Sequence, residues 1–291
     1  MASLKDLKIR IASVKSTQKI TKAMKMVAAA KLRRATERAE AARPYAERMT
    51  GVMAAVASKM SAGDAAPKLL VGTGREDTHI LVVMTSDRGL CGGFNSSIVR
   101  AAKQKIALLQ GQGKTVKIIC VGRKGFDQLA LLYRSSIIHT IRDLSKKNVF
   151  FADAQDVANA IFDAIEKENA DVVSIVYNKF KSAISQEVTF QQLMPLEIIE
   201  AKESAVSTVY EFEPEEEAIM ADLLPRNFTV QIFRALLENS ASEQGARMSA
   251  MDNATRNAGD MIGRLSQQYN RTRQAAITTE LTEIISGAEA L

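Results

Sequence analysis

The segment Thr85–Ser97, TSDRGLCGGFNSS, has the residue types and spacing that come closest to those of a chemical site. It follows a predicted strand and precedes a predicted helix, a position where loops of α/β folds bind ligands through free backbone N–H groups. Its glycines, Gly89, Gly92 and Gly93, match neither the GxGxxG dinucleotide pattern nor the GxxxxGK phosphate loop. The later segment VGRKGF is likewise typical of a strand-to-helix turn, so neither loop predicts nucleotide binding.

Cys91 lies in this segment and would be a nucleophile if a base lay beside it. The two histidines, His79 and His139, are not close in sequence, although distance along the chain does not exclude a partner. A tight turn with a packing or docking role is the favoured interpretation. The alternative is an enzyme that acts on a small ligand through Cys91, and it predicts that Cys91→Ala abolishes turnover without unfolding the chain.

Metal and disulfide chemistry are not predicted. Two cysteines, Cys91 and Cys120, and two histidines are too few for a convincing metal cluster or a disulfide framework. Both cysteines are expected to be small buried apolar residues. We therefore expect no catalytic residue, no metal site and no bound cofactor.

An α/β domain, predicted for residues 77–205, must position the loop. Four apolar, β-branched runs of strand length alternate with helix-like stretches, which is typical of a Rossmann-like, mostly parallel sheet with helices on its faces. A further run, SQEVTFQQLMPL, is predicted to return as an antiparallel neighbour. The predicted strands are THILVVMTSD, TVKIICVG, SSIIHTI and DVVSIVYNKF, and the predicted helices are SSIVRAAKQKIALL, FDQLALL and DAQDVANAIFDAIEKE.

A long helix is predicted for residues 1–60, which are rich in Ala, Lys, Arg, Met and Leu. Its first apolar stripe has three-four spacing. Gln18 and Thr21 are predicted to interrupt this stripe, and Met24 and Val27 to resume it out of phase. The stripe consists of Leu4, Leu7, Ile11 and Val14.

A second long helix is predicted for residues 225–291, after an acidic connector at 206–224. Pro225 suits the first turn of this helix, whereas Pro44 should kink the first helix without necessarily ending it. Twelve positions spaced by four and three form a heptad-type seam, which predicts a long antiparallel coiled coil with the N-terminal helix. They are Leu237, Ala241, Gln244, Met248, Met251, Thr255, Ala258, Ile262, Leu265, Tyr269, Thr272 and Ala276.

Charge is unevenly distributed along the chain. The net charge is +6, but residues 1–50 hold thirteen Lys and Arg against four Asp and Glu. A basic helix can bind nucleic acid, an anionic membrane surface or an acidic protein partner. A nucleic-acid-binding coiled coil is therefore a second alternative, which salt-dependent binding to duplex DNA would reveal. The charged start of the chain does not resemble a secretory signal, and no apolar run is long enough to span a bilayer.

The last fifteen residues, ITTELTEIISGAEAL, carry an apolar row at three-four spacing between Thr and Glu residues. Because the N-terminal helix is shorter, these turns are expected to project as a single helix with an exposed apolar face. Such a face marks an interaction surface, so we expect this end to insert into another protein. The row is Ile277, Leu281, Ile284, Ile285, Ala288 and Leu291.

Five segments, spread over essentially the whole chain, resemble the γ subunit of F-type ATP synthase: IRIASVKSTQKITKAMKMVAAAKLRRA, SDRGLCGGFN, SEQGARMSAMDNAT, YNRTRQAAI and ITTELTEIISGAEAL. The resemblance implies that the paired helices form a rotor shaft inside a ring of α and β subunits. It places the α/β domain near the ε subunit and the membrane-embedded c-ring. Proton-driven rotation would then drive the conformational cycle of the β catalytic sites, and this chain would carry no catalytic residue.

The same resemblance assigns contact residues. Those expected to contact β or α are Met24, Lys25, Arg247, Arg273, Gln274, Thr278, Ile284 and Leu291. The loop of the α/β domain is a separate candidate site, formed by Asp87, Arg88, Gly89, Cys91, Gly92 and Gly93. No nucleic acid is then expected as a partner. No thiol switch is expected either, because the inserted cysteine pair of the chloroplast relatives has no counterpart here.

The chain is expected to be peripheral on the cytoplasmic face of a bacterial inner membrane, touching the membrane only through the complex. The mitochondrial matrix side is the alternative.

Overall fold

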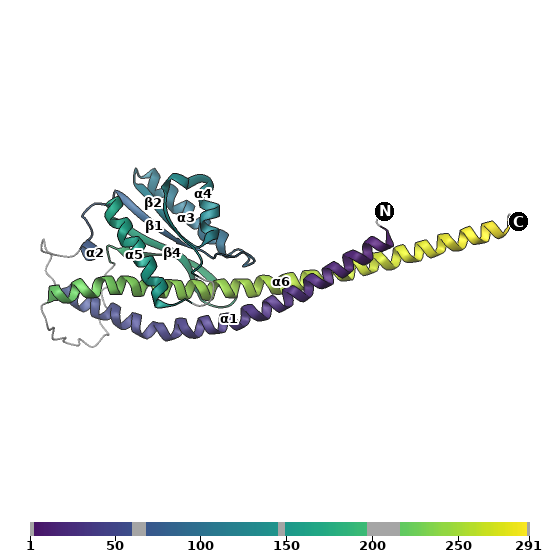
Figure 1. Cartoon of the computed structure of the whole chain (residues 1–291), viewed down its shortest axis with the longest axis horizontal. Coiled ribbons are helices and arrows are strands. Elements are labelled where there is room, and N and C mark those ends of the chain that lie inside the picture. The colour runs from purple at the N-terminus through teal and green to yellow at the C-terminus, as the bar shows by residue number, and fades with distance from the viewer. Residues whose placement is uncertain (1–2, 60–67, 145–148, 197–215, 290–291) are drawn as a thin grey trace. The chain divides into compact units, whose positions relative to one another are not determined.

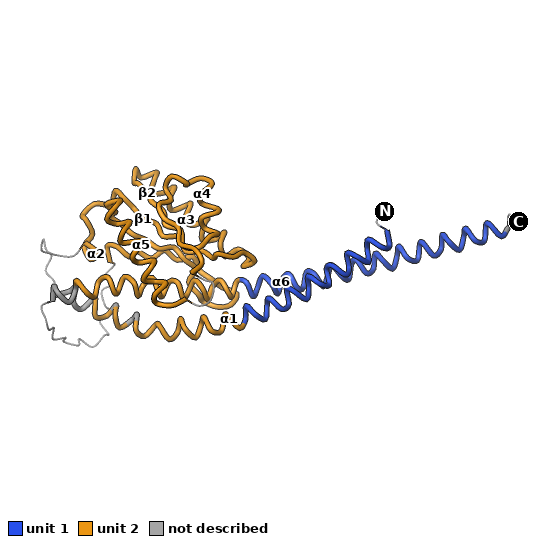
Figure 2. The backbone as a smooth tube through the Cα atoms, viewed as in Figure 1, with its two compact units in different colours: residues 1–29, 247–291 blue, residues 30–246 orange. Residues whose placement is uncertain are grey.

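The structure, a computed structural model, describes residues 3–59, 68–144, 149–196 and 216–289. The chain divides into two compact units, which are described separately (Figure 2). Unit 1 comprises residues 1–29 and 247–291, and unit 2 comprises residues 30–246. Two helices, α1 (Leu4–Lys59) and α6 (Glu216–Glu289), contribute to both units. None of the helices in the described ranges combines the length and apolar content needed to cross a bilayer.

Unit 2 contains a five-stranded sheet in the order β3-β2-β1-β4-β5 (Figure 1). The first four strands are parallel and β5 is antiparallel to β4, so the predicted mixed sheet is confirmed. All five strands lie on the segments predicted for them, because their β-branched residues fit a pleated, buried surface. They are β1 (Thr78–Met84), β2 (Thr115–Val121), β3 (Ile137–Ile141), β4 (Val172–Phe180) and β5 (Gln186–Met194).

Helices cover both faces of this sheet. Helices α3 (Phe94–Gly111) and α4 (Arg123–Tyr133) pack on the face that carries Leu81 and Val83 of β1. Helix α5 (Phe151–Glu168) and part of α6 pack on the face that carries Ile80 and Val82. Successive residues of β1 therefore enter two different cores, as expected for a central strand buried on both sides.

The predicted start of the second long helix was wrong. Helix α6 begins at Glu216, so Pro225 lies inside the helix rather than in its first turn. Proline removes one backbone hydrogen bond from a helix interior. Packing compensates locally, because the neighbouring Leu224 is buried against Met53 of α1 and Leu70 of the short helix α2 (Lys68–Val71). Pro44 also lies inside its helix, and α1 continues beyond it as predicted.

A buried carboxylate fixes the segment that enters β1. Asp171, directly before β4, accepts hydrogen bonds from the hydroxyl of Thr73 and from the N–H groups of Asp77 and Thr78. The Thr73 bond is the main cause that lowers the pKa of Asp171, and the two N–H groups act in the same direction, against the opposing effect of burial. The charged carboxylate therefore stabilises unit 2.

We expect Asp171→Asn to flatten the acid side of the stability profile. The folded-state pKa lies below the unfolded value of about 3.9, so the stabilisation is present above that pH and disappears as the pH falls through the folded-state value. The free energy of unfolding, measured by thermal unfolding, should therefore fall further for the wild-type chain than for the variant between about pH 7 and pH 3. Equal losses in the two proteins would show that this carboxylate does not contribute.

Candidate functional site

The loop singled out in the sequence lies at the carboxyl end of β1, between that strand and α3. Gly122, which follows β2, lies against it: its φ of +96° is left-handed, and a Cβ there would stand 2.2 Å from the carbonyl oxygen of Thr85. The Thr85 hydroxyl accepts a hydrogen bond from the N–H of Gly125 at 2.8 Å. The loops after β1 and β2 therefore pack directly against each other, through the backbone and the hydroxyl of Thr85.

The loop is also bonded within itself. Ser86 donates to the carbonyl oxygen of Arg88 at 2.6 Å, and its N–H donates to the side chain of Asn95 at 3.0 Å. The amide of Asn95 donates in turn to the sulfur of Cys91 at 3.2 Å. Leu90 takes a positive φ of 64° and is exposed to 64%. These bonds join Ser86, Asn95 and Cys91 to one another within the loop and stabilise the turn.

Both cysteines are buried, as predicted. Cys91 is 1% exposed, and burial raises the pKa of the Cys120 thiol to about 12. His79 lies at the amino end of β1, whereas Cys91 follows the carboxyl end of that strand. The Nε2 atom of His79 forms a hydrogen bond with the carbonyl oxygen of Glu76 at 3.1 Å. The geometry therefore does not supply Cys91 with a histidine base from β1.

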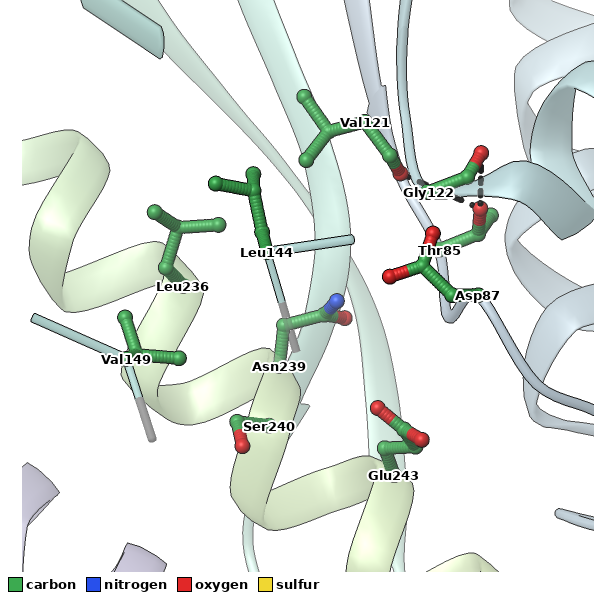
Figure 3. A pocket seen from close by; sticks show the side chains of 10 residues that line it. All are labelled: Thr85, Asp87, Val121, Gly122, Leu144, Val149, Leu236, Asn239, Ser240 and Glu243. Carbon is green, nitrogen blue, oxygen red and sulfur yellow. Dashed lines mark hydrogen bonds between the residues drawn. The ribbon is translucent and has the colours of Figure 1, made fainter. Parts of the chain in front are cut away.

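A pocket lies where the loops after β1 and β2 face α6 (Figure 3). Leu144, Val149 and Leu236 line its apolar side. Its polar side carries Asp87, Asn239 and Glu243, among others. The carboxylate of Asp87 accepts the N–H of Arg123 at 3.0 Å. Within the described ranges no three His, Cys, Asp or Glu side chains cluster as a metal site would require.

Unit 1 is an antiparallel pair of helices, formed by residues 4–29 of α1 and residues 247–289 of α6 (Figure 2). The part of the predicted seam that lies in unit 1 is confirmed, because every seam position from Met248 to Ala276 is buried or half-buried. Between Met261 and Ala276 most of the positions outside the seam are exposed. A heptad spacing gave the right answer because only one face of each helix meets the other.

The α1 stripe required a correction. Gln18 and Thr21 continue the seam instead of interrupting it, and Val27 is 57% exposed rather than part of it. Thr255 of α6 donates to the Thr21 hydroxyl at 2.8 Å, and the amide of Gln18 lies 3.5 Å from the Thr255 carbonyl oxygen. Polar side chains can occupy a seam when they bond across it, and apolar spacing alone does not reveal this.

We expect the two threonine hydroxyls to be coupled energetically. Thr21→Val removes the cross-helix partner of the Thr255 hydroxyl, which keeps only its bond to the Met251 carbonyl oxygen at 2.7 Å. The change should cost about 1 kcal/mol, whereas changing both threonines to valine should cost less than the sum of the single changes. The effect is measured by hydrogen exchange of the α6 amides around Thr255. Thr17→Val, at an exposed position of the same helix, is the matched control, and additive single changes would disprove the coupling.

An ion pair also crosses the seam. The ammonium of Lys25 lies 2.6 Å from the carboxylate of Asp252, and Arg256 lies 3.4 Å from the same carboxylate. The hydrogen bond from Lys25 is the main cause that lowers the pKa of Asp252. Lys25, expected from the resemblance to contact β, is therefore already paired within its own chain.

The paired contacts fix the register of unit 1. Thr21 faces Thr255 and Lys25 faces Asp252, so each step towards the start of α1 is matched by a step towards the end of α6. Leu4, the first residue of α1, then falls level with about Arg273 of α6. Beyond that point α6 continues without α1 beside it.

The unpaired end of α6 carries the apolar row predicted from the sequence. Ile277 is 48% exposed, Leu281 54%, Ile284 69% and Ile285 56%. Leu291, the last member of the row, lies outside the described residues. In a chain with a formed core, a continuous exposed row of this kind is typical of a protein-binding surface.

The other expected contact residues fall into two groups. Arg273, Gln274 and Thr278 are exposed on the unpaired end of α6, and the Thr278 hydroxyl donates to the carbonyl oxygen of Gln274 at 2.9 Å. Met24 and Arg247 are half-buried. The structure thus brings Arg273, Gln274, Thr278 and Ile284 onto one stretch of helix, at a distance in sequence from the loop residues Asp87, Arg88, Gly89, Cys91, Gly92 and Gly93 in unit 2.

Three polar residues of unit 2 were missed in the sequence. Asn178, Asn239 and Ser242 are buried, and hydrogen bonds join them across β4 and α6. Asn and Ser are poor residues for a helix interior, so the stretch ENSASEQ of α6 contained a signal for bonding to neighbouring backbone.

Comparison with known proteins identifies relatives over the full length. The family model described as ATP synthase matches residues 3–291. The ATP synthase gamma chain of Fuscovulum blasticum is 61% identical over 291 residues, and that of Sinorhizobium medicae is 58% identical over 291 residues. Each alignment covers 100% of both chains.

Solved structures give the same picture. A chain of the central stalk and c-ring structure of the Tetrahymena thermophila mitochondrial ATP synthase is 34% identical, with a TM-score of 0.61 over 81% of this chain and 99% of that chain. A chain of the Euglena gracilis mitochondrial ATP synthase has a TM-score of 0.69 over 99% of this chain and 94% of that chain, at 23% identity. At that identity the second comparison speaks for the fold alone.

Proposed function

This chain belongs to the family of ATP synthase γ chains, and we propose that it is the central rotor subunit that couples proton-driven rotation of a c-ring to the conformational cycle of β catalytic sites. The chain itself contributes no catalytic group. The loop around the buried Cys91 supports this part of the proposal, because Ser86, Asn95 and Cys91 are bonded within the loop.

The observation that carries the proposal is the unpaired end of α6. Its exposed row, Ile277, Leu281, Ile284 and Ile285, lies on a helix whose coiled-coil partner has already ended. A ring of α and β subunits would bury this row and hold the end of the shaft in place. Because apolar burial is not directional, the row can hold the shaft without fixing its rotational angle.

Further contacts to the ring are proposed at two levels of the shaft. Arg273, Gln274 and Thr278 are exposed near the tip, where a guanidinium fork can bind a carboxylate of β and the amide can form a neutral hydrogen bond. Met24, Lys25 and Arg247, towards the other end of unit 1, would contribute a second set of contacts. Lys25 is paired with Asp252 of its own chain, so a carboxylate of β would compete with Asp252 for the Lys25 ammonium.

The remaining partners are assigned to unit 2. We propose that the α/β domain meets the ε subunit and the c-ring, with the loop at Asp87–Gly93 as part of its contact surface. The exposed Leu90 at the tip of that loop supports such a surface. The chain would then be held at the cytoplasmic face of a bacterial inner membrane through its partners.

Purification of the complex tests the proposal. The tagged chain is isolated from its native membranes in mild detergent, and the bound subunits and ATPase activity are measured. The proposal predicts a large complex with several copies of two larger subunits for each copy of this chain. A chain that elutes alone, or with nucleic acid, would contradict it.

A further inference from the structure

Strand β4 extends beyond its neighbour β1. The last pair of the β1–β4 ladder is Val83 with Val176, whereas β4 stays paired with β5 as far as Phe180. Asn178 therefore has no strand beside it on the β1 side, although it is only 2% exposed. Buried backbone groups need hydrogen-bond partners, so another element must provide them here.

Helix α6 provides both partners. The side-chain oxygen of Asn239 accepts the backbone N–H of Asn178 at 3.1 Å, and the hydroxyl of Ser242 donates to the backbone carbonyl oxygen of Asn178 at 2.8 Å. Asn239 is 6% exposed and Ser242 is fully buried. Two side chains from one helix thus take the place of the missing strand.

Two further contacts surround this pair of bonds. The side chain of Asn178 donates to the carbonyl oxygen of Phe94, the first residue of α3, at 3.3 Å. Gly245, one turn after Ser242 on α6, lies so close to the β4–β5 turn that a Cβ on it would stand 3.2 Å from the carbonyl oxygen of Ala183. We call Asn178, Asn239, Ser242 and Gly245 the α6 splice. It joins α6 to β4 and to the β4–β5 turn, and Asn178 joins the same strand end to α3.

Resting on the proposed rotor function, we propose that the α6 splice is the torque-bearing joint that makes the α/β domain and the C-terminal helix turn as one body. The apolar contacts of α6 with the sheet, through Phe228, Ile232 and Ala235, resist separation but are not directional. Hydrogen bonds to a buried strand end are directional, so they resist rotation of α6 about its own axis. Asn239 and Ser242 are positioning residues, because they hold α6 at one rotational angle on the sheet.

The test uses the assembled complex with Asn239→Ala, Ser242→Ala and both changes together. Ser240→Ala, also on α6 but outside the splice, is the matched control. Each lost bond leaves a buried backbone group of Asn178 unsatisfied, so its local opening should rise by about tenfold. Hydrogen exchange of the peptide around Asn178 measures this opening. Proton pumping per ATP hydrolysed, measured in vesicles, reports whether torque is transmitted.

We expect exchange around Asn178 to accelerate in both single variants and most in the double variant, with pumping per ATP falling in the same order. The rate of ATP hydrolysis by these variants should remain close to that of the wild-type complex. The Ser240→Ala complex should resemble wild type in exchange, hydrolysis and pumping. Faster exchange with unchanged pumping per ATP would overturn the inference, while a wild-type complex that does not pump would contradict the rotor function itself. If the double variant does not assemble, the single variants give the same comparison.

Discussion

Replacing Ile277, Leu281, Ile284 and Ile285 together with glutamine is expected to weaken the binding of this chain to the rest of the complex about a thousandfold. Each of these side chains is about half exposed or more in the free chain. Burying the exposed part in a partner is worth about 1 kcal/mol per side chain, and four such contributions make about 4 kcal/mol. Glutamine is a good helix former, so the end of α6 should remain helical and only its apolar surface is lost.

The control changes the opposite face of the same turns. Thr279, Glu280, Thr282 and Glu283 are exposed polar residues, and their replacement by glutamine removes no apolar surface. Both variants are titrated against the complex depleted of this chain, and recovery of ATP-driven proton pumping is measured. Equal recovery by the two variants would show that the apolar row is not buried by a partner. Removal of the last dozen residues should act in the same direction as the glutamine variant.

Gly122→Ala is expected to unfold the α/β domain or to destabilise it by about 3 kcal/mol or more. A Cβ at this position would stand 2.2 Å from the carbonyl oxygen and 2.7 Å from the carbonyl carbon of Thr85. Both are backbone atoms, so no side chain can rotate away to make room. Separating them would break the bond from Thr85 N–H to the Val121 carbonyl oxygen, 2.7 Å long, that holds the two strand ends together.

Gly113→Ala separates the steric effect from the conformational one. Gly113 also has a positive φ, of 78°, but nothing lies within 4 Å of its Cβ position. It should therefore cost only the backbone strain, about 1 kcal/mol. Urea unfolding followed by hydrogen exchange of β1 and β2 compares the two. Similar losses would mean that the approach of Gly122 to Thr85 is not important for stability.

The long helices and the strands could be predicted because their signals are local and repeat. Three-four spacing along α6 and β-branched runs in the centre each report one buried face, and that face is a property of neighbouring residues. Gln18 and Thr21 were misjudged because the same rule treats polar residues as breaks. Their place in the seam depends on Thr255, which is distant in sequence and bonds across the helix pair.

The sites that depend on the length of a strand could not be predicted. The sequence of β4 does not show that its pairing with β1 stops at Val176, two residues before Asn178. The need for Asn239 and Ser242 therefore arises only in the folded sheet. Gly122 is a similar case. The segment VGRKGF was interpreted as an ordinary strand-to-helix turn, and the close approach to Thr85 comes from the neighbouring strand. The start of α6 was misplaced because Pro225 was interpreted as a boundary, although packing around Leu224 tolerates it.

Rotation of this chain within a fixed ring is the most direct test of the account. Both native cysteines are buried, so a single cysteine introduced as Gln112→Cys, at an exposed position next to α3, can be labelled selectively with a marker particle. The complex is held to a surface through its β subunits and supplied with ATP. The account predicts that the marker turns continuously in one direction. A marker that stays fixed relative to β while ATP is hydrolysed would contradict it.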